Sequence, residues 1–217
     1  MTVWAIAASG LEPLLGSADD LSRTVAESRS NHAHVTHSDE DREADLHALV
    51  ANVRAGRPGA REALVDRFAG HVRTMLVRVL GATDDIDDLA HEAFLRIFAS
   101  VGRVRDPAQL PVWITRVVVF TARDHLRRKR RAKWLWFLPH DELPEPPAPA
   151  RDNDAAEAVR AVYGLLDRLP LDERVPFALR ALGGLKWEDV AEACRISVAT
   201  AKRRVARAET SFLAMAE

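Results

Sequence analysis

The chain has 217 residues, of which 47% are hydrophobic, enough for one or two domains with apolar cores. Its formal net charge is −1, and it has a single cysteine, Cys194. One cysteine excludes a disulfide framework within the chain and favours a reducing, cytoplasmic setting, and no apolar run approaches the roughly 20 residues that span a membrane.

The near-neutral total hides three strongly charged segments. Residues 1–45 carry nine acids against three arginines, and residues 103–133 carry ten lysines or arginines against two acids. Residues 195–207 carry five basic residues and no acid. Charges sorted in this way predict separate partners for separate surfaces.

Residues 1–40 show no sustained periodicity and are expected to form a disordered or loosely attached extension. From residue 41 to residue 136 the apolar residues repeat at helical spacing, and the pattern breaks at Pro58 and at Gly81. This segment is therefore expected to be a helical domain.

The stretch "DDIDDLAHEAFLRIF", residues 84–98, joins four aspartates to an amphipathic helix. Acids stabilise a helix start by roughly 0.3–1 kcal/mol each, which accounts for one or two of them. Glu92 and Arg96 are spaced to form an ion pair within the helix. Two further hypotheses stay open: a metal site that uses Asp84, Asp88, His91 and Glu92, or a protein-binding face for a basic partner.

A second amphipathic helix, "VWITRVVVFTARDHLRRKRR" at residues 112–131, ends in a block of basic residues. Cations beside aromatic side chains suit nucleic-acid strands, because the cations bind phosphates and the rings stack on bases. Trp113 is equally well explained as a core residue. Residues 137–155 follow as an acidic, proline-rich linker that could reach on the order of 60 Å.

Residues 156–217 are expected to form a second helical domain. Within it, "LKWEDVAEACRISVATAKRRVARAE" at residues 185–209 has the layout of a helix-turn-helix. Ser197 is placed to cap the second helix. Val198, Ala201, Val205 and Ala208 would face inward, whereas a row of basic residues would face a DNA major groove.

Taken in order, these motifs resemble the σ70-type RNA polymerase sigma factors of the extracytoplasmic-function (ECF) group. The resemblance implies an all-α protein with two small helical domains, a region 2 bundle at 41–136 and a region 4 helix-turn-helix at 156–217, joined by the linker. It also implies the partners: core RNA polymerase, through its β′ clamp helices and β flap, promoter DNA, and an anti-sigma factor. No cofactor and no catalytic activity of its own are expected.

The resemblance also assigns roles to residues. Polymerase binding falls to Asp84, Asp85, Asp88, Glu92 and Arg96. Recognition of the −10 element falls to Trp113, Arg116, Arg123, His125, Arg127 and Arg128. Recognition of the −35 element falls to Thr200, Lys202, Arg203, Arg204 and Arg207.

The chain departs from the family pattern at several positions. His91 stands where glutamine is usual, and Val119 and Phe120 stand where Arg-Asn is common, which leaves the −10 specificity open. Lys186 replaces a capping Ser or Thr, and Arg195 replaces a turn glycine, where a positive φ would be strained. Two rival functions are a stand-alone helix-turn-helix regulator and a metal-dependent nucleic-acid enzyme that uses the aspartates.

Overall fold

The computed structural model describes residues 39–136 and 154–216, and every regular element within these two ranges is helical. The expected all-α fold is therefore confirmed. The segments expected to be an extension, 1–40, and a linker, 137–155, lie almost entirely outside the described residues.

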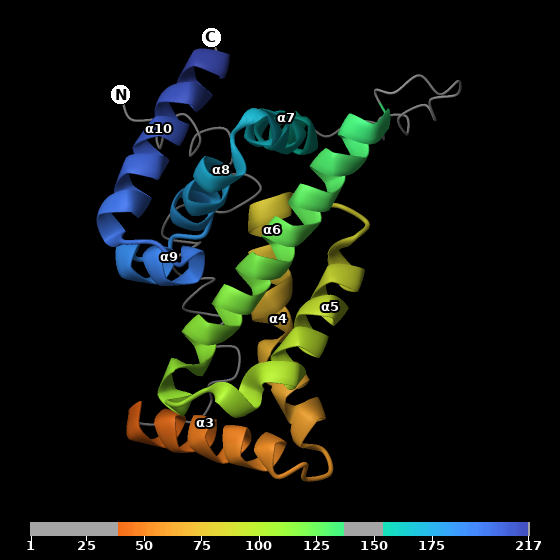
Figure 1. The fold of residues 1–217 in the computed structure, drawn as a ribbon, viewed down its shortest axis with the longest axis vertical. Coiled ribbons are helices and arrows are strands. Elements are labelled where there is room, and N and C mark those ends of the chain that lie inside the picture. Colours follow the sequence, from red (N-terminus) through yellow and green to blue (C-terminus); the bar gives the residue numbers. More distant parts are fainter. Residues whose placement is uncertain (1–38, 137–153, 217) are drawn as a thin grey trace.

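The first part of the fold is a helical bundle in which α4, α5 and α6 pack against one another and α3 crosses one end (Figure 1). Two short 3₁₀ turns, Val101–Arg103 and Pro107–Gln109, connect α5 to α6. The helices are α3 (Asp39–Arg54), α4 (Ala60–Leu80), α5 (Ile86–Ser100) and α6 (Leu110–Trp136).

The apolar stripes read from the sequence form the core of this bundle. Side chains three and four residues apart share one face of a helix, and burying each one contributes about 1.5–3 kcal/mol. The buried residues include Leu64, Phe68 and Val72 of α4, Ile86, Leu89 and Ile97 of α5, and Ile114, Val118 and Leu126 of α6.

The second part contains the expected helix-turn-helix. Its helices are α7 (Asp154–Arg168), α8 (Leu171–Phe177), the π-helical turn Ala178–Leu182, α9 (Trp187–Cys194) and α10 (Val198–Ala216). Phe177 and Phe212 stack at 5.7 Å between ring centres and join α8 to α10. Pro176 lies inside α8. Because proline cannot donate the backbone hydrogen bond of a helix interior, it favours the change of pitch that follows.

The two parts pack together: α8 and α9 lie against α6, and Val175, Leu179 and Val190 belong to the same buried cluster as the bundle core. Figure 1 shows α8 and α9 beside the middle of α6. The sequence indicated a linker long enough to separate two domains. That linker lies almost entirely outside the described residues, and the two described parts share one apolar interface.

The end of α4 is capped by side chains from the second part. Arg174 of α8, only 1% exposed, donates to the Val79 carbonyl oxygen from Nη2 at 3.1 Å. The hydroxyl of Tyr163 donates to the Val77 carbonyl oxygen at 2.9 Å. The Tyr163 ring also lies 3.0 Å from where a Cβ of Gly81 would stand, and Gly81 has a φ of 89°. Arg174 thus supplies a donor to the Val79 carbonyl, one of those that a helix end leaves without a partner. Tyr163 adds a second donor at the Val77 carbonyl, which also accepts the backbone N–H of Gly81 at 2.8 Å.

Candidate functional site

The acidic start of α5 is exposed. Asp84 and Asp85 precede the helix, with Asp85 at the N-cap position, and Asp87 and Asp88 lie in its first turn. Arg73 of α4 forms an ion pair with Asp87. Among the described residues, no partner forms an ion pair or hydrogen bond with the side chain of Asp84 or Asp88, so their charges are open to a partner.

The outer face of α5 continues from these acids through His91, Glu92 and Leu95. His91 is exposed, and Leu95 is 55% exposed, unusually high for a large apolar side chain. Leu95 was not predicted as a functional residue, although its position outside the predicted apolar stripe indicates that it is exposed. The face therefore combines negative charge with one apolar contact point.

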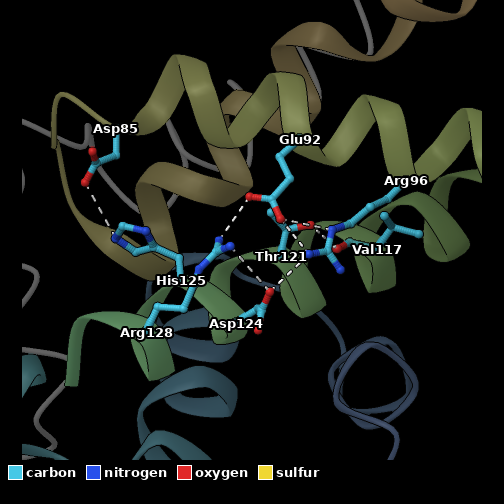
Figure 2. Close-up of polar contacts among 8 residues, drawn as sticks. All are labelled: Asp85, Glu92, Arg96, Val117, Thr121, Asp124, His125 and Arg128. Carbon is cyan, nitrogen blue, oxygen red and sulfur yellow. Dashed lines mark hydrogen bonds and ion pairs between the residues drawn. The ribbon is translucent and has the colours of Figure 1, made fainter. Parts of the chain in front are cut away.

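Glu92 lies in a network of ion pairs between α5 and α6 (Figure 2). Arg96 donates to Glu92 from Nη2 at 2.5 Å and from Nε at 3.2 Å, as the helical spacing predicted, and Arg128 Nη2 donates to Glu92 at 3.0 Å. Asp124 accepts from Arg96 at 3.0 Å and lies 3.9 Å from Arg128. Glu92, which is expected to bind the polymerase, thus contacts Arg128, which is expected to bind DNA. Asp124, which bridges both arginines, was not singled out from the sequence.

Two pKa shifts follow from this packing. The hydrogen bond from Arg96, followed by that from Arg128, lowers the pKa of Glu92, so Glu92 is an anion at neutral pH. Burial lowers the pKa of His125, although Asp85, 3.6 Å away, opposes the shift. His125 is therefore largely neutral above its usual pKa and contributes little positive charge.

The four side chains suggested as metal ligands do not form a cage. In the described ranges no group of three or more His, Cys, Asp or Glu side chains is arranged to hold a metal ion. Glu92 is turned toward Arg96 and Arg128, whereas Asp84, Asp88 and His91 are exposed.

The residues of α6 expected to bind the −10 element are dispersed. Trp113 is half-buried and packs against the core, and Arg116 forms an ion pair with Glu192 of α9. Arg116, Arg123 and Arg127 nevertheless line one groove of about 590 Å³ between α5, α6 and the end of α9. His125 and Arg128 face the start and the middle of α5 instead (Figure 2).

Val119 and Phe120, the two positions of α6 that depart from the family pattern, differ in exposure. Both line the groove, but Val119 is buried, whereas Phe120 is 55% exposed. The guanidinium of Arg96 lies 4.8 Å from the centre of the Phe120 ring, a cation–π contact. Cys194 lies on the opposite wall, where burial raises the pKa of its thiol to about 11.

The helix-turn-helix has the predicted local geometry. The Ser197 Oγ accepts from the Thr200 backbone N–H at 3.2 Å, which confirms the N-cap. Lys186, at the start of α9, makes no such bond. Arg195 adopts φ 56° and ψ 47°, so the expected strain at this turn is present.

The exposed side of α10 carries the residues expected to read the −35 element. Lys202 and Arg203 are exposed, and Thr200 is half-buried beside Ser197. Arg204 pairs with Asp172 of α8 at 3.4 Å, and Arg207 pairs with Glu173 of α8 at 3.2 Å. The inward positions Ala201, Val205 and Ala208 are buried, as predicted, whereas Val198 is half-buried.

Two known families match the segments of the chain that carry the α5, α6 and α10 surfaces. The family described as Sigma-70 region 2 matches residues 64–132, and the family described as Sigma-70, region 4 matches residues 160–211. Together the two matches cover more than half of the chain.

Two curated relatives cover most of the chain. An ECF RNA polymerase sigma-E factor of Haemophilus influenzae is 30% identical over 170 residues, 74% of this chain and 89% of that protein. An RNA polymerase sigma-H factor of Pseudomonas aeruginosa is 29% identical over 173 residues, 76% of this chain and 90% of that protein.

Two solved structures share the fold. CnrH in complex with the cytosolic domain of CnrY matches with a TM-score of 0.54 at 24% identity, covering 77% of this chain and 94% of that chain. The sigma factor RpoE of Bartonella quintana, in complex with the anti-sigma factor NepR, matches with a TM-score of 0.52 at 18% identity, covering 71% and 94%.

Proposed function

Because the chain belongs to the ECF group of σ70-type RNA polymerase sigma factors, we propose that it binds core RNA polymerase and directs it to a set of promoters. The sigma factor supplies recognition, and the polymerase supplies the catalysis. Its place of action is the cytoplasm, where the polymerase works. Among the described helices, none is both long and apolar enough to cross a membrane.

One observation carries this proposal: an exposed acidic face on α5 and an exposed basic face on α10 lie within the two matched segments. The acidic face is suited to a basic protein surface. The basic helix begins with an N-capped turn and is suited to a DNA major groove. We therefore assign polymerase binding to Asp84, Asp85, Asp88, Glu92 and Arg96, and −35 recognition to Thr200, Lys202, Arg203, Arg204 and Arg207. Family membership leads us to propose that α6 recognises the −10 element through Trp113, Arg116, Arg123, His125, Arg127 and Arg128.

The decisive experiment is run-off transcription with purified core polymerase and a promoter library. The wild type should produce discrete transcripts that core polymerase alone does not. The double variant Asp88→Lys with Glu92→Lys should lose both polymerase binding and transcription, because it reverses the charge of the α5 face.

A matched control separates this effect from a general change of charge. Glu62 and Asp66 are exposed on α4 at the same four-residue spacing. Glu62→Lys with Asp66→Lys should leave polymerase binding close to that of the wild type. A chain that binds duplex DNA specifically but never co-purifies with core polymerase would instead be a stand-alone regulator.

The same family membership leads us to propose an anti-sigma factor as the regulatory partner. A protein that co-purifies with the chain should then suppress run-off transcription when it is added back in equal amount. It should also displace core polymerase from the chain in a pull-down. A co-purified protein that leaves both measurements unchanged would contradict this part of the proposal.

A further inference from the structure

The network between α5 and α6 contains two carboxylates and two guanidinium groups, so its charges balance. Glu92 accepts from both arginines, and Asp124 is close to both. Figure 2 shows Arg128 reaching from α6 toward Glu92, with Asp124 between the two arginines. Any partner that neutralises one carboxylate therefore leaves one arginine in excess.

The distances decide which arginine that is. Arg96 lies 3.0 Å from Asp124, whereas Arg128 lies 3.9 Å from the same carboxylate. Arg128 keeps its close contact, 3.0 Å, only with Glu92. If Glu92 is neutralised, Arg96 retains Asp124 and Arg128 becomes the uncompensated cation. The side chain of Arg128 is also 54% exposed, against 32% for Arg96, so it is the one that can turn to solvent.

We propose that Glu92 holds Arg128 away from DNA in the free protein, and that a polymerase cation that pairs with Glu92 releases Arg128 to a DNA phosphate. Asp124 is the positioning residue that retains Arg96 when this happens. The proposal rests on the proposed function, because it takes Glu92 as a polymerase contact and Arg128 as a DNA contact. It makes polymerase binding and DNA binding mutually favourable, as linkage requires.

The exposure of the network suits such an exchange. Glu92 and Asp124 are 29% and 37% exposed, so water screens the pairs and each contributes little to stability. A fully buried pair would resist the replacement of one partner, because an unpaired buried charge is strongly unfavourable. Here the arginine that leaves Glu92 meets solvent and phosphate.

The test measures DNA binding by the full-length protein without polymerase. The probe is a fluorescently labelled single strand of mixed sequence, followed by anisotropy across a salt series. Glu92→Gln removes the charge but keeps the size of the side chain. This variant should bind the strand about fivefold more tightly near 0.1 M salt. The slope of log K against the logarithm of the salt concentration should become steeper by about 0.7, the value for one added phosphate contact on a single strand.

Two comparisons make the result specific. Glu62→Gln changes the net charge equally on the exposed start of α4, so it reports any long-range effect. In an Arg128→Gln background, Glu92→Gln should produce no gain, because the released cation is missing. An equal gain in Glu62→Gln, or a gain that persists in the Arg128→Gln background, would overturn the proposal.

The outcome can be separated from that of the proposed function. If the wild type directs run-off transcription but Glu92→Gln binds the single strand no better than the wild type, the release of Arg128 is wrong and the proposed function stands. If the wild type directs no transcription with core polymerase, the proposed function fails, whatever the DNA affinities of the variants.

Discussion

Arg116 of α6 and Glu192 of α9 form an ion pair that joins the bundle to the helix-turn-helix. Their side chains are 36% and 41% exposed, so solvent screens the attraction. Arg174, by contrast, is 1% exposed and bonded to carbonyl groups of α4. The two contacts connect the same two parts of the molecule, but burial makes their energetic consequences different.

Glu192→Gln should change the free energy of unfolding by less than about 1 kcal/mol, the usual range for exposed pairs. Equilibrium denaturation in urea, followed by circular dichroism, measures this change. The effect should shrink further at high salt, because salt screens exposed charges. A much larger loss would mean that this pair, and not the apolar interface, holds the two parts together.

Arg174→Met should lower the free energy of unfolding by about 2 kcal/mol, because it leaves buried carbonyl oxygens of α4 without donors. The cost stays moderate because Asp167, the ionic partner of Arg174, is 55% exposed and remains hydrated. The same denaturation experiment measures it. Arg168→Met, at an exposed position of α7, is the matched control and should have little effect. Equal effects of the two substitutions would contradict this account of the α4 cap.

Stability should fall in mild acid because of His71. Burial, with a smaller contribution from Arg78, lowers the pKa of His71 to about 4. In the unfolded chain the pKa is about 6.5, so below that pH the unfolded state binds the proton and the folded state does not. The free energy of unfolding therefore has its full value above pH 6.5, where His71 is neutral in both states, and falls between pH 6.5 and pH 4.

The expected loss between pH 7 and pH 5 is about 2 kcal/mol, measured by urea denaturation at each pH. His71→Gln is the control, since its amide can donate to Thr115 but does not titrate. The His71 Nε2 is 2.8 Å from the Thr115 hydroxyl, which itself donates to the Pro111 carbonyl oxygen, so the ring nitrogen must be the donor. An identical pH dependence in His71→Gln would rule out His71 as the source.

Arg195→Gly should raise the free energy of unfolding by about 0.5–1 kcal/mol. A non-glycine residue in the left-handed region costs about 1–2 kcal/mol, and the greater freedom of glycine in the unfolded chain offsets part of that gain. The thermal midpoint should rise accordingly. Arg203→Gly, at an exposed position inside α10, should instead lower the free energy of unfolding by about 1 kcal/mol. If both substitutions are destabilising, the positive φ of Arg195 carries no such cost.

Much of the fold and part of the site could be predicted from local sequence. Ser197 was predicted to cap α10 and does so, because a cap involves only residues three apart. The pair of Glu92 with Arg96 was predicted for the same reason. The exposure of Asp84 and Asp88 followed from the apolar stripe of α5. The roles in polymerase and DNA binding came from the resemblance to the family and stay proposals.

Contacts between distant segments could not be predicted in this way. The ion pair of Arg128 with Glu92 joins residues 36 positions apart, and the bond from Arg174 to Val79 joins residues 95 positions apart. The sequence by itself determined the helices, their buried faces and the segregation of charge, because these depend on a period of 3.6 residues and on composition. Only the tertiary structure decided which charges are paired and which are free, because side-chain ion pairs form over a few ångströms between helices whose relative placement depends on the packing of the whole core.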